Sequence, residues 1–416
     1  MELFDKNLND TLYLPEYEGN SLVNLSNSIL NSYGIKPLHN LLNFDETIFN
    51  NDKKNIVLIV IDALGYYNLL RLAEKSPDFS ALLDFFNLKK ITSVFPTTTS
   101  VALTSLVTGT YPIEHGIMGY LLFLERFNSI MNMINLSPIG FPRDIFVRHG
   151  LNPNKFLPVK TIFQHLTNAG IKNWTITSNA FKNSGLTRMH HQGSSIKGYS
   201  DVVEMIMLIK DLLEKKNESN FIFCYWGLSD MYGHIYGTES EEYCYGIELI
   251  FEILMKKLLK RLDKKILKET LFLITGDHGQ INTSWRDEKW LNASDEMTKK
   301  YFVMPPTGDT RSIYLNTNDD TSFKDYFRNR YDNQFTLLTK MDAVETGLFG
   351  DISKNNGVNG IIIEKNLRRI GKYIALAHSC NSLNYKYTSE DRRQRGKHGS
   401  LNEWEVFVPL LIYADR

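Results

Sequence analysis

Short apolar runs alternate with longer amphipathic stretches along much of the chain. The clearest run, NIVLIVIDALG, covers Asn55–Gly65 and is apolar at nearly every position up to Asp62. Such runs are typical of buried parallel strands that helices cover on both faces. Similar runs predict further strands at Leu88–Val94, Trp174–Thr177, Phe221–Trp226, Leu271–Thr275 and Val406–Tyr413.

The amphipathic stretches between these runs predict helices. They cover Ser21–Tyr33, Leu38–Leu42, Thr161–Ala169, Val202–Lys216 and Glu239–Leu262. Strands that alternate with helices predict an α/β fold built on a doubly wound, mostly parallel sheet flanked by helices.

Two regions interrupt the alternation. Residues 121–158 look like a short excursion, whereas residues 283–395 are too long for a loop and predict an inserted smaller subdomain or lid. The insert has a strand candidate at Arg311–Asn316 and a helix candidate at Phe323–Arg330. We therefore expect an N-terminal helical extension (1–54), a core (55–282 and 396–416) and the insert (283–395).

Composition changes this picture little. With 43% hydrophobic and 23% charged residues, the chain has the composition of a soluble globular protein, and its formal net charge of zero gives no indication of nucleic-acid binding. The first residues lack the basic and apolar regions of a signal peptide, and no apolar run is long enough to span a membrane. Three widely spaced cysteines suit a reducing compartment, so we expect a cytoplasmic protein.

The stretch Phe95–Tyr120 carries candidate chemistry. It begins with a Pro-Thr-Thr-Thr-Ser turn, continues into an apolar helical run and reaches Gly109. This order puts a hydroxyl at a helix N-terminus, where it caps free N–H groups or stands beside a bound phosphate. Capping alone explains most such threonines, so the stretch by itself leaves both interpretations open.

Acidic and imidazole side chains follow several predicted strands. Because the carboxyl ends of parallel strands meet at one edge of a sheet, we expect these side chains to converge. Taken one at a time, each residue could have an ordinary structural role instead. It could form a turn, belong to an i, i+4 pair on a helix or lie in a surface loop. Together they suit two divalent cations, with zinc the first candidate and manganese the second. The set is Asp62, Asp230, His234, Asp277, His278 and His398.

The chain resembles the alkaline phosphatase superfamily, and within it the type I phosphodiesterase/nucleotide pyrophosphatase family. The resemblance covers about residues 55–280 and the C-terminal segment, and leaves 1–54 and most of 283–395 outside. The matching segments, in the family's order, are VLIVIDALG, FPTTTSVALTSLVTGTYPIEHGI, SDMYGHIYG, LFLITGDHGQ and KHGSLNEWEVFVPLLIY.

The resemblance implies a function and a role for each residue of the set. Thr99 would be the nucleophile, with Thr98 and Ser100 as the alternatives. Its hydroxyl would join Asp62, Asp277 and His278 around one metal, while Asp230, His234 and His398 would hold the second. The implied reaction is hydrolysis of a phosphodiester or pyrophosphate bond in a small molecule such as a nucleotide, through a phosphothreonine. Phosphomonoester or phosphonate hydrolysis, or a metal-binding regulatory or defence module without turnover, are the alternatives.

Several further residues stay open at this stage. Tyr120 stands where the nucleotide pyrophosphatase branch usually has a phosphate-binding asparagine, and it either donates a hydrogen bond or only packs. Arg311 is a candidate substrate-binding residue from the insert. Trp285 and Trp290 either stack on a nucleobase or fill the core of the insert. His190 and His191 stand in a Gly/Ser-rich segment that favours a solvated loop over a metal site. No motif indicates the oligomeric state.

Overall fold

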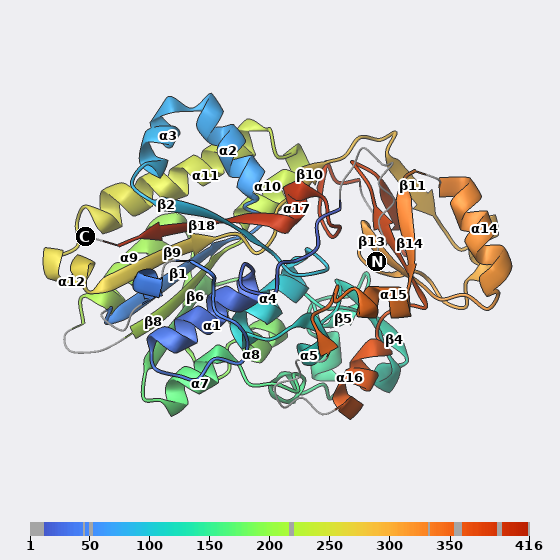
Figure 1. Cartoon of the computed structure of the whole chain (residues 1–416), viewed down its shortest axis with the longest axis horizontal. Helices are drawn as coiled ribbons and strands as arrows, with labels where there is room; N and C mark the ends of the chain where they lie inside the picture. The colour runs from blue at the N-terminus through green and yellow to red at the C-terminus, as the bar shows by residue number, and fades with distance from the viewer. Residues whose placement is uncertain are drawn as a thin grey trace.

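The computed structural model describes residues 12–44, 46–49, 53–215, 220–331, 333–352, 360–388 and 393–414. Among these residues, a central seven-stranded sheet carries the fold, in the order β2–β18–β9–β1–β8–β6–β7 (Figure 1). All of its pairs are parallel except those of β18 with β9 and β2. The predicted doubly wound, mostly parallel sheet is confirmed. Its strands are β1 (Asn55–Ile61), β2 (Asn87–Thr92), β6 (Lys172–Ser178), β7 (Ser195–Tyr199), β8 (Asn220–Trp226), β9 (Thr270–Thr275) and β18 (Phe407–Tyr413).

Helices cover both faces of this sheet (Figure 1). Successive residues of a strand point to opposite faces, and β1 shows the consequence because it is buried along its whole length. Leu58 belongs to one hydrophobic core together with residues of α1 and α4, whereas Ile59 belongs to a second core with residues of α9 and α11. These helices are α1 (Leu22–Ser32), α4 (Thr99–Thr108), α9 (Val202–Leu213) and α11 (Glu241–Ile253).

A second sheet forms the smaller lobe, at the right of Figure 1. All its strand pairs are antiparallel, in the order β14–β15–β13–β12–β3–β4–β5. The excursion after Tyr120 and the long insert therefore build one sheet together, although the sequence suggested two separate regions. The strands are β3 (Leu121–Leu124), β4 (Ser129–Asn132), β5 (Ser137–Pro138), β12 (Thr307–Gly308), β13 (Ser312–Leu315), β14 (Phe335–Thr339) and β15 (Tyr373–Ala377).

Helix α14 (Asp320–Tyr331) packs against this sheet through Phe323 and Phe327, so the strand and helix predicted inside the insert are confirmed. Two short strand pairs accompany the second sheet. Strand β10 (Ile281–Asn282) pairs antiparallel with β17 (Gly396–Lys397), and β11 (Glu288–Leu291) pairs parallel with β16 (Ser382–Tyr385).

The N-terminal segment differs from the prediction in one element. Helix α1 forms as predicted and packs against α4, but residues 38–42 form no helix. Their backbone bonds to side chains of α1 instead: Leu38 N–H donates to Asn27 Oδ1 at 2.7 Å, and Leu42 N–H donates to Ser28 Oγ at 2.9 Å. Residues 1–11 of the predicted extension lie outside the described residues.

The remaining predicted helices form close to their expected bounds. Thr161 caps α7 (Ile162–Asn168), and α11 continues into a π-helical turn at Leu254–Leu259. The end of the predicted helix at Lys216 lies outside the described residues. Strand β7 was not predicted because its sequence, SIKGY, is polar. No described helix has both the length and the apolar character that crossing a bilayer requires.

The other helices connect these elements. They are α2 (Tyr66–Lys75), α3 (Pro77–Leu83), α5 (Pro112–His115), α6 (Ile145–Arg148), α8 (Gly185–His190), α10 (Leu228–Tyr236), α12 (Lys264–Lys268), α13 (Glu296–Tyr301), α15 (Lys340–Glu345), α16 (Gly360–Leu367) and α17 (Glu403–Val406).

Candidate active site

Three neighbouring strands deliver acidic residues to one edge of the central sheet. Asp62 directly follows β1, and Asp277 and His278 follow β9 on one side of it. On the other side, β8 leads into α10, which carries Asp230 in its first turn and His234 one turn later. Ligands collect at the carboxyl ends of strands in sheets of this kind, so the strand order itself explains the convergence.

Helix α4 points its N-terminus at this edge. Thr98 is the N-cap residue and Thr99 the first helical residue, and the Thr98 side chain makes no capping hydrogen bond in the described structure. Thr99 Oγ1 lies 3.0 Å from His278 Nε2 and 3.4 Å from Asp62 Oδ1. The uncapped first turn has partial positive charge, which favours a bound anion beside the Thr99 hydroxyl.

His398 arrives from the C-terminal part of the chain and packs against the turn before Thr99. Its Nδ1 lies 2.9 Å from Thr97 O, and its ring stacks on that of His278 with centroids 4.0 Å apart. The next residue, Gly399, has φ +124°, and a Cβ there would lie 2.9 Å from Asp309 Cγ. Only glycine therefore fits the backbone that places His398 in the site.

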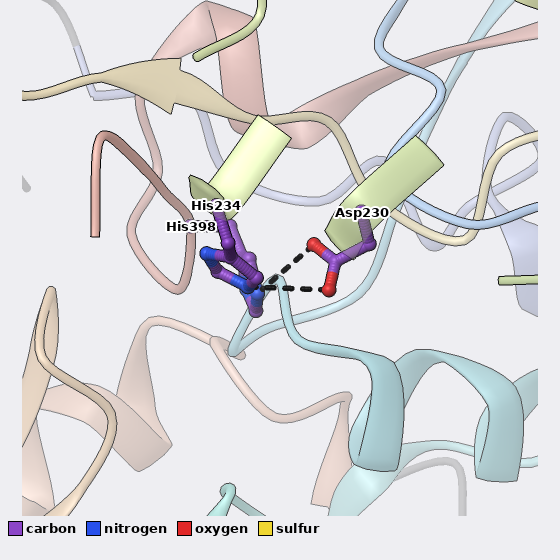
Figure 2. A group of neighbouring side chains, drawn as sticks. All are labelled: Asp230, His234 and His398. Atoms are coloured by element: carbon purple, nitrogen blue, oxygen red, sulfur yellow. Dashed lines mark ion pairs between the residues drawn. The ribbon is translucent and has the colours of Figure 1, made fainter. Parts of the chain in front are cut away.

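Asp230, His234 and His398 form one group of candidate metal ligands (Figure 2). The two imidazoles come from separate parts of the chain and both face the Asp230 carboxylate. His234 Nε2 lies 3.2 Å from Asp230 Oδ2, and His398 Nε2 lies 3.7 Å from Asp230 Oδ1. Each Nδ1 bonds a backbone carbonyl, that of Gly396 for His234 and that of Thr97 for His398. These hydrogen bonds orient the two rings so that both Nε2 atoms point toward the Asp230 carboxylate.

A second group of candidate ligands consists of Asp62, Asp230 and His278. The family resemblance implied Asp277, not Asp230, as the partner of Asp62 and His278. Asp277 Oδ1 accepts bonds from the backbone N–H groups of Ala63 and His278, and its Oδ2 lies 3.6 Å from His278 Nε2. The two groups share Asp230, so they join five of the six predicted ligands, and Asp277 adjoins them through His278.

Burial and mutual repulsion disfavour the negative charges in this site. Burial raises the pKa of Asp62 well above its ordinary value, and the charges of Asp277 and Asp230 raise it further. Burial also raises the pKa of Asp277. For Asp230, burial acts in the same direction, but His234 outweighs it and holds its pKa below the ordinary value. Burial and the neighbouring His278 lower the pKa of His398 far below its usual range.

The donor set fits divalent cations. Three carboxylates and three imidazoles supply the oxygen and nitrogen ligands that zinc and manganese accept. Within the described residues, Asp277 Oδ2 is buried without a hydrogen-bond partner, which is costly unless a cation or proton occupies the space beside it. Burial first, and repulsion from Asp277 and Asp230 second, raise the pKa of Asp62, and a nearby cation would oppose both effects.

A cavity of about 340 Å³ opens over these groups. Asp62, Thr99, Asp230, His234 and His398 all line it, so it gives a small molecule access to the candidate metal ligands and to the Thr99 hydroxyl. Its volume is in the range of small-molecule sites.

Comparison with known proteins identifies the family of this chain. The sequence model of the type I phosphodiesterase/nucleotide pyrophosphatase family matches residues 56–401, which is most of the chain. The chain belongs to this family. It is therefore a hydrolase, and the resemblance found in the sequence is confirmed. No curated protein sequence matches it.

Solved structures share the fold of this family member. Murine ectonucleotide pyrophosphatase/phosphodiesterase 5 is 16% identical, with a TM-score of 0.62 over 86% of this chain and 88% of its own. An inactive threonine-to-alanine variant of that murine protein, in complex with AMP, gives a TM-score of 0.60 at 16% identity over 86% of this chain and 87% of its own. Phosphonoacetate hydrolase from Sinorhizobium meliloti 1021, in complex with phosphonoformate, gives 0.60 at 15% identity over 87% of this chain and 91% of its own.

Of the two substrate-binding candidates, only Tyr120 reaches the cavity of this phosphodiesterase-family site. Its side chain lines the cavity together with Thr99, and its hydroxyl oxygen accepts a bond from Asn132 Nδ2 at 2.6 Å. Arg311 is 0% exposed and does not line the cavity. Its guanidinium bonds both carboxylate oxygens of Glu405, at 2.8 and 2.7 Å, and the carbonyl oxygens of Ser379 and Asn381. With its donors engaged in this way, Arg311 joins two parts of the fold and is not retained as a substrate contact.

Three further residues reach the site. Two of them, Tyr225 and Asp309, have no sequence signal, whereas Lys397 ends the basic run DRRQRGK, whose sequence is compatible with either a solvated loop or a phosphate contact. Tyr225 lies within the apolar run of β8, yet its hydroxyl donates to Asp62 Oδ2. Asp309 stands in the turn between β12 and β13, and Lys397 precedes His398; both line the cavity. A tyrosine inside a buried strand and an acid outside the segments that carry the sequence resemblance look ordinary, so only the fold reveals Tyr225 and Asp309.

The prediction of a solvated loop at His190 and His191 is wrong. His190 is 2% exposed, at the end of α8, and its Nε2 lies 2.9 Å from Thr104 Oγ1. His191 Nδ1 lies 3.1 Å from Thr175 Oγ1. Burial lowers the pKa of His190 to about 3, so this histidine is a neutral core residue.

Proposed function

We propose that this chain hydrolyses a phosphodiester or pyrophosphate bond in a small molecule, with a nucleotide as the leading candidate and Thr99 as the nucleophile. The observation that carries the proposal is the position of the Thr99 hydroxyl. It stands at an uncapped helix N-terminus, 3.0 Å from His278 Nε2 and 3.4 Å from Asp62 Oδ1, at the wall of the cavity. A hydroxyl, an anion-attracting helix end and convergent metal ligands are the parts that phosphoryl transfer requires.

Two divalent cations are part of the proposal, with zinc preferred and manganese the alternative. Asp62, Asp277, His278 and the Thr99 hydroxyl would hold one, and Asp230, His234 and His398 the other. When bound, such cations make a hydroxyl more acidic and neutralise charge on phosphoryl oxygens.

The protein's own residues then account for the order of events. Thr99 Oγ1 attacks phosphorus, and the bond from phosphorus to the leaving oxygen breaks, which leaves a phosphothreonine. The N–H groups in the first turn of α4 stabilise a non-bridging oxygen during this step. A water molecule later displaces Thr99 and completes hydrolysis.

A finding on a relative supports the threonine role. The murine protein with AMP bound is an inactive threonine-to-alanine variant, so in that protein a threonine is needed for activity and AMP occupies a site. We extend this to Thr99, and Tyr120 remains the proposed contact to the substrate. Our expectation of a cytoplasmic protein also stays a prediction.

A substrate panel tests the proposed reaction. Wild type and Thr99→Ala would be treated with a chelator, supplied with zinc or manganese, and assayed with a bis-aryl phosphodiester, an aryl phosphomonoester, a dinucleoside polyphosphate and a phosphonate. We expect metal-dependent cleavage of the diester or the polyphosphate that collapses in Thr99→Ala. Preference for the monoester or the phosphonate would mean that the chain is a phosphomonoesterase or a phosphonate hydrolase instead. Metal binding without any turnover would favour a binding module that has kept the fold.

A further inference from the structure

A basic cleft is lined by residues from the end of β3, from the turn Glu125–Phe127 that follows it, from residues 150–156 and from the end of α16. Its volume is about 680 Å³. Helix α16 packs beside α5, at the lower right of Figure 1. None of the residues that line this cleft also lines the reaction cavity. The cleft is therefore a separate candidate binding site.

Positive charge dominates this cleft, although the whole chain has a formal net charge of zero. Five basic side chains line it, against one acidic side chain, Glu125. Arg368 forms ion pairs with Glu125 at 3.8 Å and with Glu364 at 2.9 Å. Within the part of the chain that the structure describes, the other four basic side chains form no ion pair. They are Arg126, Lys155, Lys365 and Arg369. These four positive charges are available to a bound anion.

Arg369 is the one member of this set that is not exposed. Its guanidinium lies over Phe156, 5.2 Å from the ring centre, and its Nη1 donates to Gly116 O at 2.6 Å. Among the described residues this is the only hydrogen bond of the guanidinium, so its other N–H groups are left for water or a ligand. Arg126 lies in the same way over Phe127, 5.5 Å from the ring centre. Each ring orients a guanidinium and leaves its N–H groups able to bind an anion.

Burial works against the charge of Arg369. It lowers the pKa of Arg369 to about 10, because removal from water disfavours the positive form. The side chain is still charged at neutral pH, and a bound anion would offset the cost of its burial. Arg369 therefore has an energetic reason to attract an anion, in addition to its position in the cleft.

The number of cations indicates the kind of anion. Arginine binds phosphate oxygens through two parallel N–H···O bonds, and lysine binds them as a point charge. A lone carboxylate would match one of the four cations, whereas a chain of phosphates carries several charges in a small volume. The volume of the cleft is that of a small-molecule site.

We propose that this cleft binds a small oligophosphate, a compound with two or more linked phosphate groups, through Arg369 and the three exposed basic side chains of the same set. The inference does not rest on the proposed function, because the cleft includes neither Thr99 nor any candidate metal ligand. A single phosphate would leave some of the cations unmatched, so affinity should increase with the number of linked phosphates.

Calorimetry on the full chain, freed of metal, tests the proposal, because the carboxylates of the metal-free reaction cavity repel anions. The probes are inorganic tripolyphosphate, pyrophosphate and phosphate. We expect tripolyphosphate to bind most tightly and phosphate most weakly, with affinities that fall as salt is added. Lys155→Gln/Lys365→Gln should weaken tripolyphosphate binding about tenfold or more, because each change removes a charged hydrogen-bond donor.

A matched control removes the same amount of charge elsewhere. Lys264→Gln/Lys268→Gln changes two exposed lysines of α12, at the far left of Figure 1, and should leave tripolyphosphate binding unchanged. Absence of tripolyphosphate binding, equal affinity for phosphate, or equal losses in the two double variants would overturn the proposal. Binding of hexaglutamate in place of tripolyphosphate would also overturn it, in favour of an acidic protein segment.

Lysine acetylation locates the site without any substitution. In metal-free wild type, tripolyphosphate should protect Lys155 and Lys365 from acetic anhydride and leave Lys264 and Lys268 as reactive as before, which mass spectrometry of the peptides would measure. Unchanged acetylation of Lys155 and Lys365 would place the anion elsewhere and contradict the proposal. Neither measurement involves turnover or Thr99, so both remain decisive if the wild-type chain hydrolyses none of the substrate panel.

Discussion

Arg311 and Glu405 form an ion pair in which both side chains are 0% exposed. The pair joins the second sheet to the segment that follows His398. Glu405 Oε1 also accepts the backbone N–H of Ser400 at 3.0 Å. The pair therefore fixes the loop of residues 398–400 from one end, while Thr97 fixes it from the other.

Loss of one partner of the Arg311–Glu405 pair should destabilise the fold. Arg311→Met leaves the Glu405 charge buried without its guanidinium, and breaking a buried pair typically costs about 3–5 kcal/mol. We expect a loss of this size in the free energy of unfolding, measured with urea, together with weaker zinc binding because His398 moves. Arg368→Met removes exposed pairs with Glu364 and Glu125 and should leave both quantities unchanged. Equal effects of the two variants would contradict this role for Arg311.

Tyr225 should control metal affinity through Asp62. Its hydroxyl donates to Asp62 Oδ2, and Tyr225→Phe removes that bond while preserving the ring. Losing a partner that orients a metal ligand typically lowers affinity about 10- to 100-fold. Competition with a zinc chelator would measure the change, with Tyr236→Phe, whose side chain is exposed, as the matched control. Unchanged zinc affinity in Tyr225→Phe would show that Asp62 needs no such support.

The metal-free protein should respond to pH through Asp309. Burial raises the pKa of this carboxyl from 3.8 to about 6, so the folded state retains its proton over that interval while the unfolded state has lost it. Ionised Asp309 therefore weakens the fold above about pH 6, and Asp309→Asn should stabilise the chelated protein at pH 8. That gain should shrink as the pH falls through about 6 and vanish below 3.8.

Urea unfolding at several pH values measures the difference between wild type and Asp309→Asn. Asp319→Asn is a control of opposite sign, since bonds from Ser322 lower the Asp319 pKa and the native charge stabilises the fold at neutral pH. A gain from Asp309→Asn that is the same at pH 4 and pH 8 would mean that Asp309 is not protonated in the folded state.

Gly399 should be needed for zinc binding as well as for the local backbone conformation. Gly399→Ala adds a Cβ that would lie 2.9 Å from Asp309 Cγ, at φ +124°. Gly150→Ala carries similar backbone strain at φ +98° but meets nothing within 4 Å. Both variants should lose about 1 kcal/mol of stability from the left-handed backbone, but only Gly399→Ala should also lose zinc binding and hydrolysis. Normal zinc binding in Gly399→Ala would show that the loop tolerates the added methyl group.

Much of the fold and of the site could be predicted because buried parallel strands have a distinctive sequence. The run before Asp62 is apolar on consecutive positions, and so is the run before Asp277, so both strand ends could be located. The second sheet could not be foreseen, because β12 has only two residues and its neighbour β3 comes from a segment nearly two hundred residues earlier.

Arg311 shows why a side chain's role escapes sequence reasoning. Its partner Glu405 is 94 residues away, and nothing in either local sequence indicates a buried pair. An arginine outside the segments that carry the sequence resemblance therefore suggested a contact with an anionic substrate. Trp290 shows the same limit, since only the pairing of β11 with β16 distinguishes it from the exposed Trp285.

The stereochemical course at phosphorus tests the central claim most directly. A chiral phosphorothioate analogue of the ester that the enzyme cleaves would be hydrolysed in water enriched in oxygen-18, and the configuration of the product determined. Attack by Thr99 followed by attack by water makes two in-line displacements, each of which inverts phosphorus, so we predict net retention. Net inversion would mean that water attacks the substrate directly, and Thr99 would not be the nucleophile.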